Sequence, residues 1–135
     1  MLREGTTVDK SAIRRHMALG VAVLTASGLL SLAGTGTAEA AALCSGRKVR
    51  TLPFSTGSVQ IYKKRGYVCA VTLRERQGTR TYMSVSVRAW RARPAVNKGL
   101  FKHHAGPVTV HAGHRRVLIK GTVGSDSASS GWIRL

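Results

Sequence analysis

The sequence predicts a small all-β domain, a sandwich or barrel of about six short strands held by one disulfide. Three observations predict this fold. Hydrophobic residues alternate with polar residues at a period of two along several runs. Turn residues, glycine above all, separate these runs at short intervals. No stretch after residue 40 has the period of an amphipathic helix, so an all-β class is favoured over a mixed one.

The first 40 residues have the three-part pattern of a secretory signal peptide. The basic pair Arg14-Arg15 precedes an apolar run over residues 17–32, and Ala38-x-Ala40 predicts cleavage before residue 41. The run is short for a membrane span, so no stable span is expected after cleavage. Residues 41–135 are therefore expected to form one secreted domain, and the arginine pair leaves both the general and the twin-arginine export routes open.

Cys44 and Cys69 are the only cysteines in the chain, and both follow the predicted cleavage site. An isolated pair in an exported protein predicts one disulfide, because the compartments outside the cytosol are oxidising. Closing a loop of about 25 residues should stabilise the domain by about 3 kcal/mol.

The first clear element is a hairpin over residues 57–76, "GSVQIYKKRGYVCAVTLRER". Its two alternating arms meet at a basic turn in which Gly66 supplies the positive φ that a tight turn needs. On the second arm Cys69, Val71 and Leu73 share a face, which the pattern predicts to be the buried side of the sheet.

The run over residues 80–90, "RTYMSVSVRAW", alternates most regularly and predicts a half-buried strand. Pro94 is expected to end this strand, and the segment that contains it, residues 92–99, is predicted to be a loop. Four further segments complete the prediction: a second hairpin with arms at 107–112 and 114–123, a polar loop at 124–130, and a last short strand at 131–135.

Three segments carry a resemblance to a known family. They are "VQIYKKRGYVCAVTL", "HHAGPVTVHAG" and "GSDSASSGW", in this order and over nearly all of residues 44–132. Together they resemble the spore-associated protein A family of small secreted streptomycete proteins. That family commonly has a second cysteine pair, which is absent here. The resemblance implies an exported actinobacterial protein associated with spores or the cell surface, without an assigned reaction.

The predicted mature domain is strongly basic. Four of the chain's 22 lysines and arginines and three of its five acids lie in the first 40 residues, which leaves 18 basic residues, two acids and a net charge of +16. Such a domain attracts polyanions. The two remaining acids, Glu75 and Asp126, provide few groups for carboxylate catalysis or for orienting a catalytic histidine, so no enzyme is expected.

Four histidines lie within residues 101–116, namely His103, His104, His111 and His114. A zinc site needs three or four converging ligands, usually with cysteine or carboxylate among them. The cysteines are predicted to be oxidised, and the stretch contains no acid and several cations. We therefore expect histidines on an ordinary strand, with no metal and no other cofactor.

The outward face of the 80–90 strand is the candidate binding surface. Cations alternate with aromatic rings there, a pattern typical of sheets that bind single-stranded nucleic acid or sugar polymers. Tyr62 is expected to face the same way from a neighbouring strand. An ordinary solvated strand face is the alternative interpretation. The residues assigned to polyanion binding are Arg80, Tyr82, Arg88, Trp90, Arg91 and Arg93.

The sequence thus predicts a secreted basic protein of the spore or cell surface, structural or surface-binding and without enzymatic activity. One alternative is a module that binds anionic polymers such as teichoic acid, polysaccharide or extracellular DNA, with nucleic acid bound nonspecifically. A small secreted toxin or inhibitor is the other.

Overall fold

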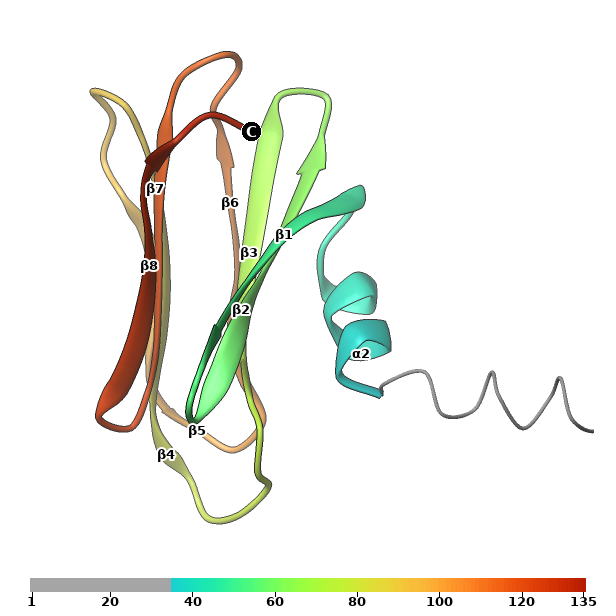
Figure 1. The fold of residues 1–135 in the computed structure, drawn as a ribbon, viewed down its shortest axis with the longest axis vertical. Coiled ribbons are helices and arrows are strands. Elements are labelled where there is room, and N and C mark those ends of the chain that lie inside the picture. Colours follow the sequence, from blue (N-terminus) through green and yellow to red (C-terminus); the bar gives the residue numbers. More distant parts are fainter. Residues whose placement is uncertain (1–34) are drawn as a thin grey trace, which may run out of the picture. The chain divides into compact units, whose positions relative to one another are not determined.

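Two antiparallel four-stranded sheets face each other in residues 35–135, the part of the chain that the structure describes (Figure 1). This computed structural model begins with one helix, α2 (Thr35–Leu43). The strands that follow are β1 (Arg47–Phe54), β2 (Gly57–Lys64), β3 (Tyr67–Arg74), β4 (Thr81–Ala89), β5 (Ala95–Phe101), β6 (His104–His111), β7 (Val117–Val123) and β8 (Asp126–Ile133). The all-β class and the sandwich are confirmed, with eight strands in this range instead of about six.

The first sheet has the strand order β1-β2-β3-β6, and the second has the order β5-β4-β7-β8. The chain crosses between the sheets three times, after β3, after β5 and after β6. In the packed pair β6 lies against β4 and β5, β2 against β7, and β1 against β8.

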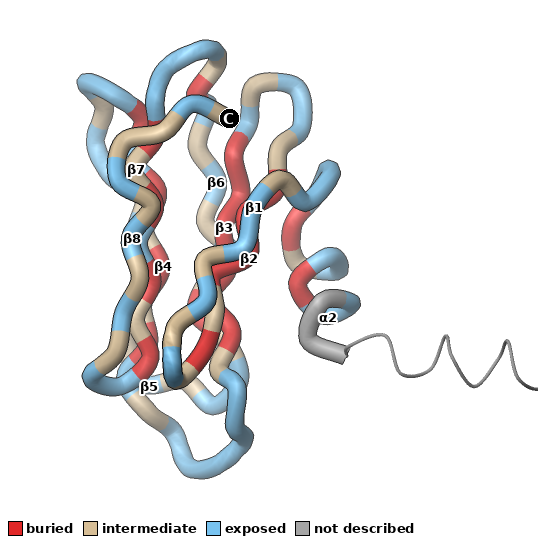
Figure 2. Tube along the Cα trace, viewed as in Figure 1, coloured by how far each residue is buried: buried red, intermediate tan, exposed pale blue. Residues whose placement is uncertain are grey.

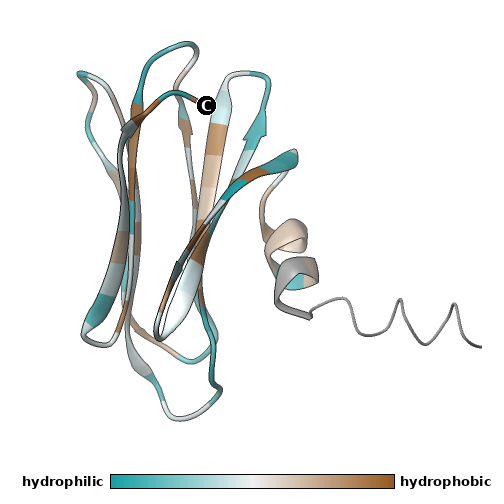
Figure 3. Ribbon diagram, in the orientation of Figure 1, coloured by the Kyte–Doolittle hydropathy of each residue, from teal (hydrophilic) through white to brown (hydrophobic). Residues whose placement is uncertain are grey.

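The core fills the space between the two sheets with small and branched side chains, and Figure 2 shows these buried positions along the central strands. The most hydrophobic positions lie along the strands, while the turns are mostly hydrophilic (Figure 3). The fully buried side chains of this core include Val59, Ile61, Val68, Met83, Val85, Val87, Val117 and Ile119. The half-buried strand predicted over residues 80–90 is confirmed as β4, in which Met83, Val85, Val87 and Ala89 face the core.

The two sheets lie close together at Gly121 of β7. A methyl group at this position would overlap Val59 Cγ2 and Thr72 Oγ1 on the facing sheet. Thr72 is fully buried, and its hydroxyl donates a hydrogen bond to the Ser84 carbonyl oxygen at 2.9 Å. One polar bond thus joins β3 to β4 inside an otherwise apolar core.

The hairpin predicted over residues 57–76 is confirmed as β2 and β3. Lys64 pairs with Tyr67, so the turn consists of Arg65 and Gly66, which both have positive φ values, 50° and 82°. Two positive φ values are the signature of the type I′ turn, whose twist matches that of the flanking strands.

Three predictions about the second half of the chain are wrong. The segment predicted as a loop at 92–99 includes the first part of β5, and most of the segment predicted as a polar loop at 124–130 belongs to β8. The segments predicted as a second hairpin are β6 and β7, which lie in different sheets and do not pair. Residues 112–116 therefore cross from one sheet to the other.

The disulfide prediction is confirmed: Cys44 and Cys69 are bonded, with Cα atoms 5.8 Å apart. The prediction that Cys69, Val71 and Leu73 share a buried side of the sheet is confirmed as well, but this side is not the one that faces the second sheet. Because Cys69 pairs with Tyr62 and Val68 faces the core, Cys69 lies on the outer face of the first sheet, together with Val71 and Leu73. Helix α2, instead of the second sheet, buries this face (Figure 1).

Helix α2 contains the predicted cleavage motif. Ala40 is fully buried against the outer face of the first sheet, and its carbonyl oxygen accepts a hydrogen bond from the Cys44 amide at 3.0 Å. The basic pair and the apolar run of the predicted signal peptide lie outside the described residues. Within residues 35–135 no helix is long and apolar enough to cross a membrane.

Candidate functional site

The outer face of the second sheet carries cations together with exposed aromatic and aliphatic side chains. Tyr82 of β4 pairs with Leu100 of β5, and their side chains are 44% and 64% exposed. The strand register adds these residues to the same face: Ser84, Ser86, Arg88, Val96, Lys98, Leu118, Lys120, Thr122 and Trp132. This face is therefore open along its length, and it is positive at its centre.

Two tryptophans and two arginines lie in one group at the end of this face where β4 ends. The Trp90 and Trp132 rings pack edge to face, with centroids 5.0 Å apart. The Arg116 guanidinium lies 4.5 Å from the centroid of the Trp90 ring, and the Arg88 guanidinium 5.8 Å from that of Trp132. We name Arg88, Trp90, Arg116 and Trp132 the arginine–tryptophan array.

The rings hold the two guanidinium groups in place at the surface. A cation over an indole face is attracted by the ring quadrupole, which restricts the side chain without neutralising its charge. Arg88 is restrained further, because its Nε donates to the Ala92 carbonyl oxygen at 3.0 Å. Since Arg116 already lies over Trp90, this ring supports a cation and is less available as a stacking platform for a ligand.

The structure brings together only two of the six predicted polyanion-binding residues, Arg88 and Trp90. Tyr82 shares their outward face of the second sheet but stands at the start of β4, six residues of strand or roughly 20 Å from Arg88. Arg80 precedes β4 at the opposite end, and eight residues of strand separate it from Arg88 by roughly 26 Å.

Arg91 and Arg93 are exposed in the connection between β4 and β5. The prediction of one arginine cluster around the strand is therefore replaced by separate cations at its two ends.

Tyr62 is not part of this surface. It lies on the first sheet under α2 and is only 2% exposed. The residues that sequence reasoning missed are Arg116 and Trp132. Their position beside Arg88 depends on the order β4-β7-β8 and on the pairing of Leu118 with both Arg88 and Trp132. In the sequence, the only indication of this group was an aromatic residue, Trp132, in the last strand.

The four histidines are not gathered at one point. His104 and His111 stand at opposite ends of β6, roughly 23 Å apart for seven residues of strand. His111 lies on the outer face of the first sheet with Tyr67, and the two rings pack edge to face with centroids 4.9 Å apart. His103 Nδ1 lies 2.7 Å from Gln77 Oε1. No three His, Cys, Asp or Glu side chains in residues 35–135 converge as a metal site would need.

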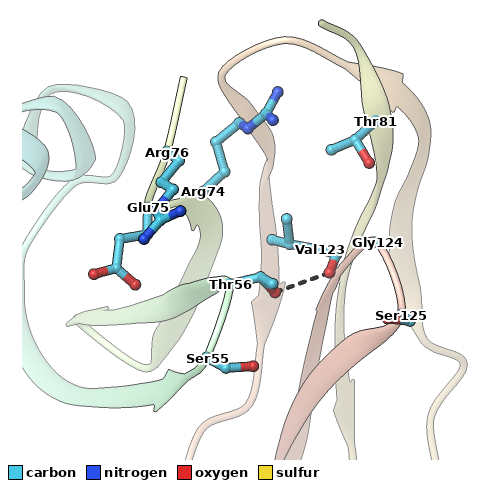
Figure 4. A pocket seen from close by; sticks show the side chains of 9 residues that line it. All are labelled: Ser55, Thr56, Arg74, Glu75, Arg76, Thr81, Val123, Gly124 and Ser125. Atoms are coloured by element: carbon cyan, nitrogen blue, oxygen red, sulfur yellow. Dashed lines mark hydrogen bonds between the residues drawn. The ribbon is translucent and has the colours of Figure 1, made fainter. Parts of the chain in front are cut away.

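A cavity lies at the end of the sandwich where β3 ends and β4 begins. This end cavity has a volume of about 510 Å³ (Figure 4). It is lined by Ser55, Thr56, Arg74, Glu75, Arg76, Thr81, Val123, Gly124 and Ser125. Its walls come from the β1–β2 turn, the segment after β3, the start of β4 and the β7–β8 turn.

Comparisons with known proteins add no relative: no protein-family model, curated protein or solved structure matches this chain. The two surfaces described above, the outer face of the second sheet and the end cavity, are thus the grounds on which its function is inferred.

Proposed function

We propose that residues 41–135 form an exported binding protein, not an enzyme, which attaches to anionic polymers through the outer face of the second sheet. The polymers are those of a cell or spore surface, such as teichoic acid or anionic polysaccharide, and extracellular DNA is bound in the same nonspecific way. Recognition depends on charge density along the polymer and not on its sequence.

The arginine–tryptophan array is the observation that carries this proposal. Guanidinium groups form paired hydrogen bonds with phosphate and carboxylate oxygens, and they bind best when their geometry is set beforehand. Arg88 and Arg116 are held against Trp132 and Trp90 before any ligand arrives. Lys98 and Lys120 extend the positive face away from the array, along the direction that a polymer would follow.

Two further features agree with this role. The disulfide indicates an oxidising compartment. The net charge of +16 over residues 41–135 draws polyanions toward the domain before contact. The resemblance to the spore-associated protein A family supports a location at the spore or cell surface, which we include in the proposal.

Salt dependence tests the proposal. We expect teichoic acid and duplex DNA of random sequence to bind the oxidised domain, with each neutralised phosphate contributing about 0.9 to the slope of log K against log salt on duplex DNA. A site of about four to six phosphates should lose roughly two to three decades of affinity between 50 and 200 mM salt. Fluorescence anisotropy over this range measures the slope.

A matched pair of double variants locates the site. Arg88→Gln with Arg116→Gln should lower the slope by about two units, because both cations lie in the array. Arg80→Gln with Arg93→Gln removes the same charge outside the array and should change the slope by less than half as much. Equal effects of the two double variants would show that binding is spread over the whole surface. Absence of binding at low salt would overturn the proposal itself.

A further inference from the structure

The cations on the outer face of the second sheet lie in successive rows, where a row is a set of residues paired across β5, β4, β7 and β8. The pairing places one cation in each of four rows: Lys98 opposite Ser84, Lys120 opposite Ser86, Arg88 opposite Leu118, and Arg116 opposite Trp90. All four cationic residues are exposed. We name Lys98, Lys120, Arg88 and Arg116, in this order along the face, the cation ladder.

The rows of the cation ladder have the period of a particular kind of polymer. Neighbouring rows are two residues of strand apart, which is roughly 7 Å and contains six backbone bonds. A poly(glycerol phosphate) chain also has six backbone bonds from one phosphorus atom to the next, so its extended form repeats at about the same distance. A polysaccharide with a carboxylate on every second sugar ring has a longer repeat, and its charges would fall out of step with the rows.

The cation ladder is narrow enough to hold one chain. Its members come from the adjacent strands β5, β4 and β7, which together are roughly 10 Å wide, and the long lysine side chains can reach across this width. No carboxylate side chain of residues 41–135 lies in the four rows. Glu75 lines the end cavity, and Asp126 accepts a hydrogen bond at 2.6 Å from Ser55 of the same lining. A chain of phosphates on the ladder therefore meets only cations and neutral side chains.

The arginine–tryptophan array favours a chain without bases. Single-stranded nucleic acid gains much of its affinity from bases that stack on aromatic rings. Both rings within the four rows already carry a guanidinium, Trp90 that of Arg116 and Trp132 that of Arg88. Tyr82 lies one row beyond the ladder, opposite Leu100. The middle rows contribute hydroxyl groups, which suit the hydroxyl groups of a polyol.

We propose that the cation ladder binds a single extended chain of poly(glycerol phosphate), the backbone of a teichoic acid, with its axis parallel to β4 and one phosphate in each row. This inference rests on the proposed function and deepens it, because it names the anionic polymer that the outer face of the second sheet prefers. The chain is selected by the distance between its charges in addition to their density.

Synthetic chains of four phosphates separate spacing from charge. Propane-1,3-diol spacers keep the six-bond repeat of the glycerol chain, whereas hexane-1,6-diol spacers lengthen the repeat to nine bonds at equal charge. In fluorescence anisotropy at about 50 mM salt, the hexanediol chain should bind about tenfold more weakly, because fewer of its phosphates meet a cation at the same time. A thymidylate chain with four phosphates has the six-bond repeat and should bind no more tightly than the propanediol chain. Equal binding of the two spacers, or tighter binding of the thymidylate, would overturn the proposal.

A matched pair of double variants tests the ladder itself. Lys98→Gln with Lys120→Gln should lower the salt slope on the propanediol chain by about 1.4, since two phosphate contacts on a single chain are lost. The preference for propanediol over hexanediol should fall below about threefold. Lys48→Gln with Lys64→Gln removes the same charge from exposed positions of the first sheet and should leave slope and preference nearly unchanged.

The outcomes distinguish this inference from the proposed function. Equal losses of slope in the two lysine double variants would overturn the cation ladder. If teichoic acid and duplex DNA still bound with a slope that depends on Arg88 and Arg116, the proposed function would stand without the ladder. Absence of binding by all the synthetic chains, by teichoic acid and by DNA at low salt would overturn both.

Discussion

The Tyr62 hydroxyl is buried beneath α2 and has no hydrogen-bond partner among the described residues. A buried hydroxyl in this state has lost its water contacts without replacement, which is unfavourable by roughly 1–3 kcal/mol. Burial also raises the pKa of the Tyr62 phenol above its ordinary value of 10.0, because the charged phenolate would be desolvated. The ring, by contrast, packs well against Cys69 and Ala40.

Tyr62→Phe keeps this ring and removes the hydroxyl. We expect the free energy of unfolding at pH 7 to stay unchanged or to rise by about 1 kcal/mol. In the wild type, the part of the stability that depends on neutral Tyr62 is fully present below pH 10, the pKa of the phenol in the unfolded chain. It is lost as the pH rises toward the higher pKa of the folded state, because the unfolded chain ionises first. The variant should lose less stability above pH 10. Urea titrations at several pH values measure both effects; a large loss at pH 7 would show that the hydroxyl has a partner.

Gly121 tests the spacing of the sheets, because any side chain there would overlap Val59 and Thr72. We expect Gly121→Ala to lower the free energy of unfolding by about 1–3 kcal/mol through overpacking. Gly78→Ala is the matched control, since its new methyl group would meet only Arg74 Nη2 at 3.5 Å and should change stability by less than about 0.5 kcal/mol. Thermal unfolding measures the loss of stability in each variant. Equal losses in the two variants would contradict the close approach of the two sheets at Gly121.

At the scale of elements, the disulfide connects Cys44, the residue after α2, to the middle of β3. Reducing the Cys44–Cys69 bond in a chain that retains α2 should lower stability by about 3 kcal/mol. The loss should be local at first, because α2 is held only by its contacts with one face of the first sheet. Hydrogen exchange with and without reductant should therefore accelerate at the Cys44 amide while β2 and β3 stay protected. Uniform acceleration over both sheets would show instead that the bond holds the whole sandwich.

Strands with a clear period of two could be predicted from the sequence, whereas β5 and most of β8 could not. β2, β3 and β4 are buried on at least one face, and the alternation of apolar and polar residues in their sequences indicated this burial. β5 and β8 are edge strands with one neighbour each, so few of their side chains need to be apolar. β8 is rich in serine and resembled a loop for this reason. The short turn after β6 was compatible with a hairpin and with a crossing between sheets.

The candidate surface could be predicted in part for a related reason. Alternation along β4 correctly placed Tyr82, Arg88 and Trp90 on one outward face. The partners of these residues come from β7 and β8, and only strand order brings Arg116 and Trp132 to them. The end cavity is built from turns of three separate hairpins and connections, so no local pattern in the sequence indicates it.

At the scale of the whole molecule, like charge opposes the compact state. The net charge of +16 over residues 41–135 should destabilise the domain at low ionic strength through self-repulsion. Raising salt from about 0.01 to 0.15 M shortens the screening length from about 30 to 8 Å, and the melting temperature should rise. Thermal unfolding in sodium chloride measures this, with Arg80→Gln/Arg93→Gln expected to respond less. A melting temperature independent of salt would contradict the effect.

The two tryptophans of the chain are both in the arginine–tryptophan array, with ring centroids 5.0 Å apart. Indole emission selectively excited over tyrosine therefore comes from a single spot on the surface, and rings this close also couple in the near-ultraviolet circular dichroism. A polyanion that draws Arg116 away from Trp90 would change both signals, whereas a ligand bound away from the array would leave them unchanged. The molecule thus carries its own optical label, which reports whether this surface is occupied.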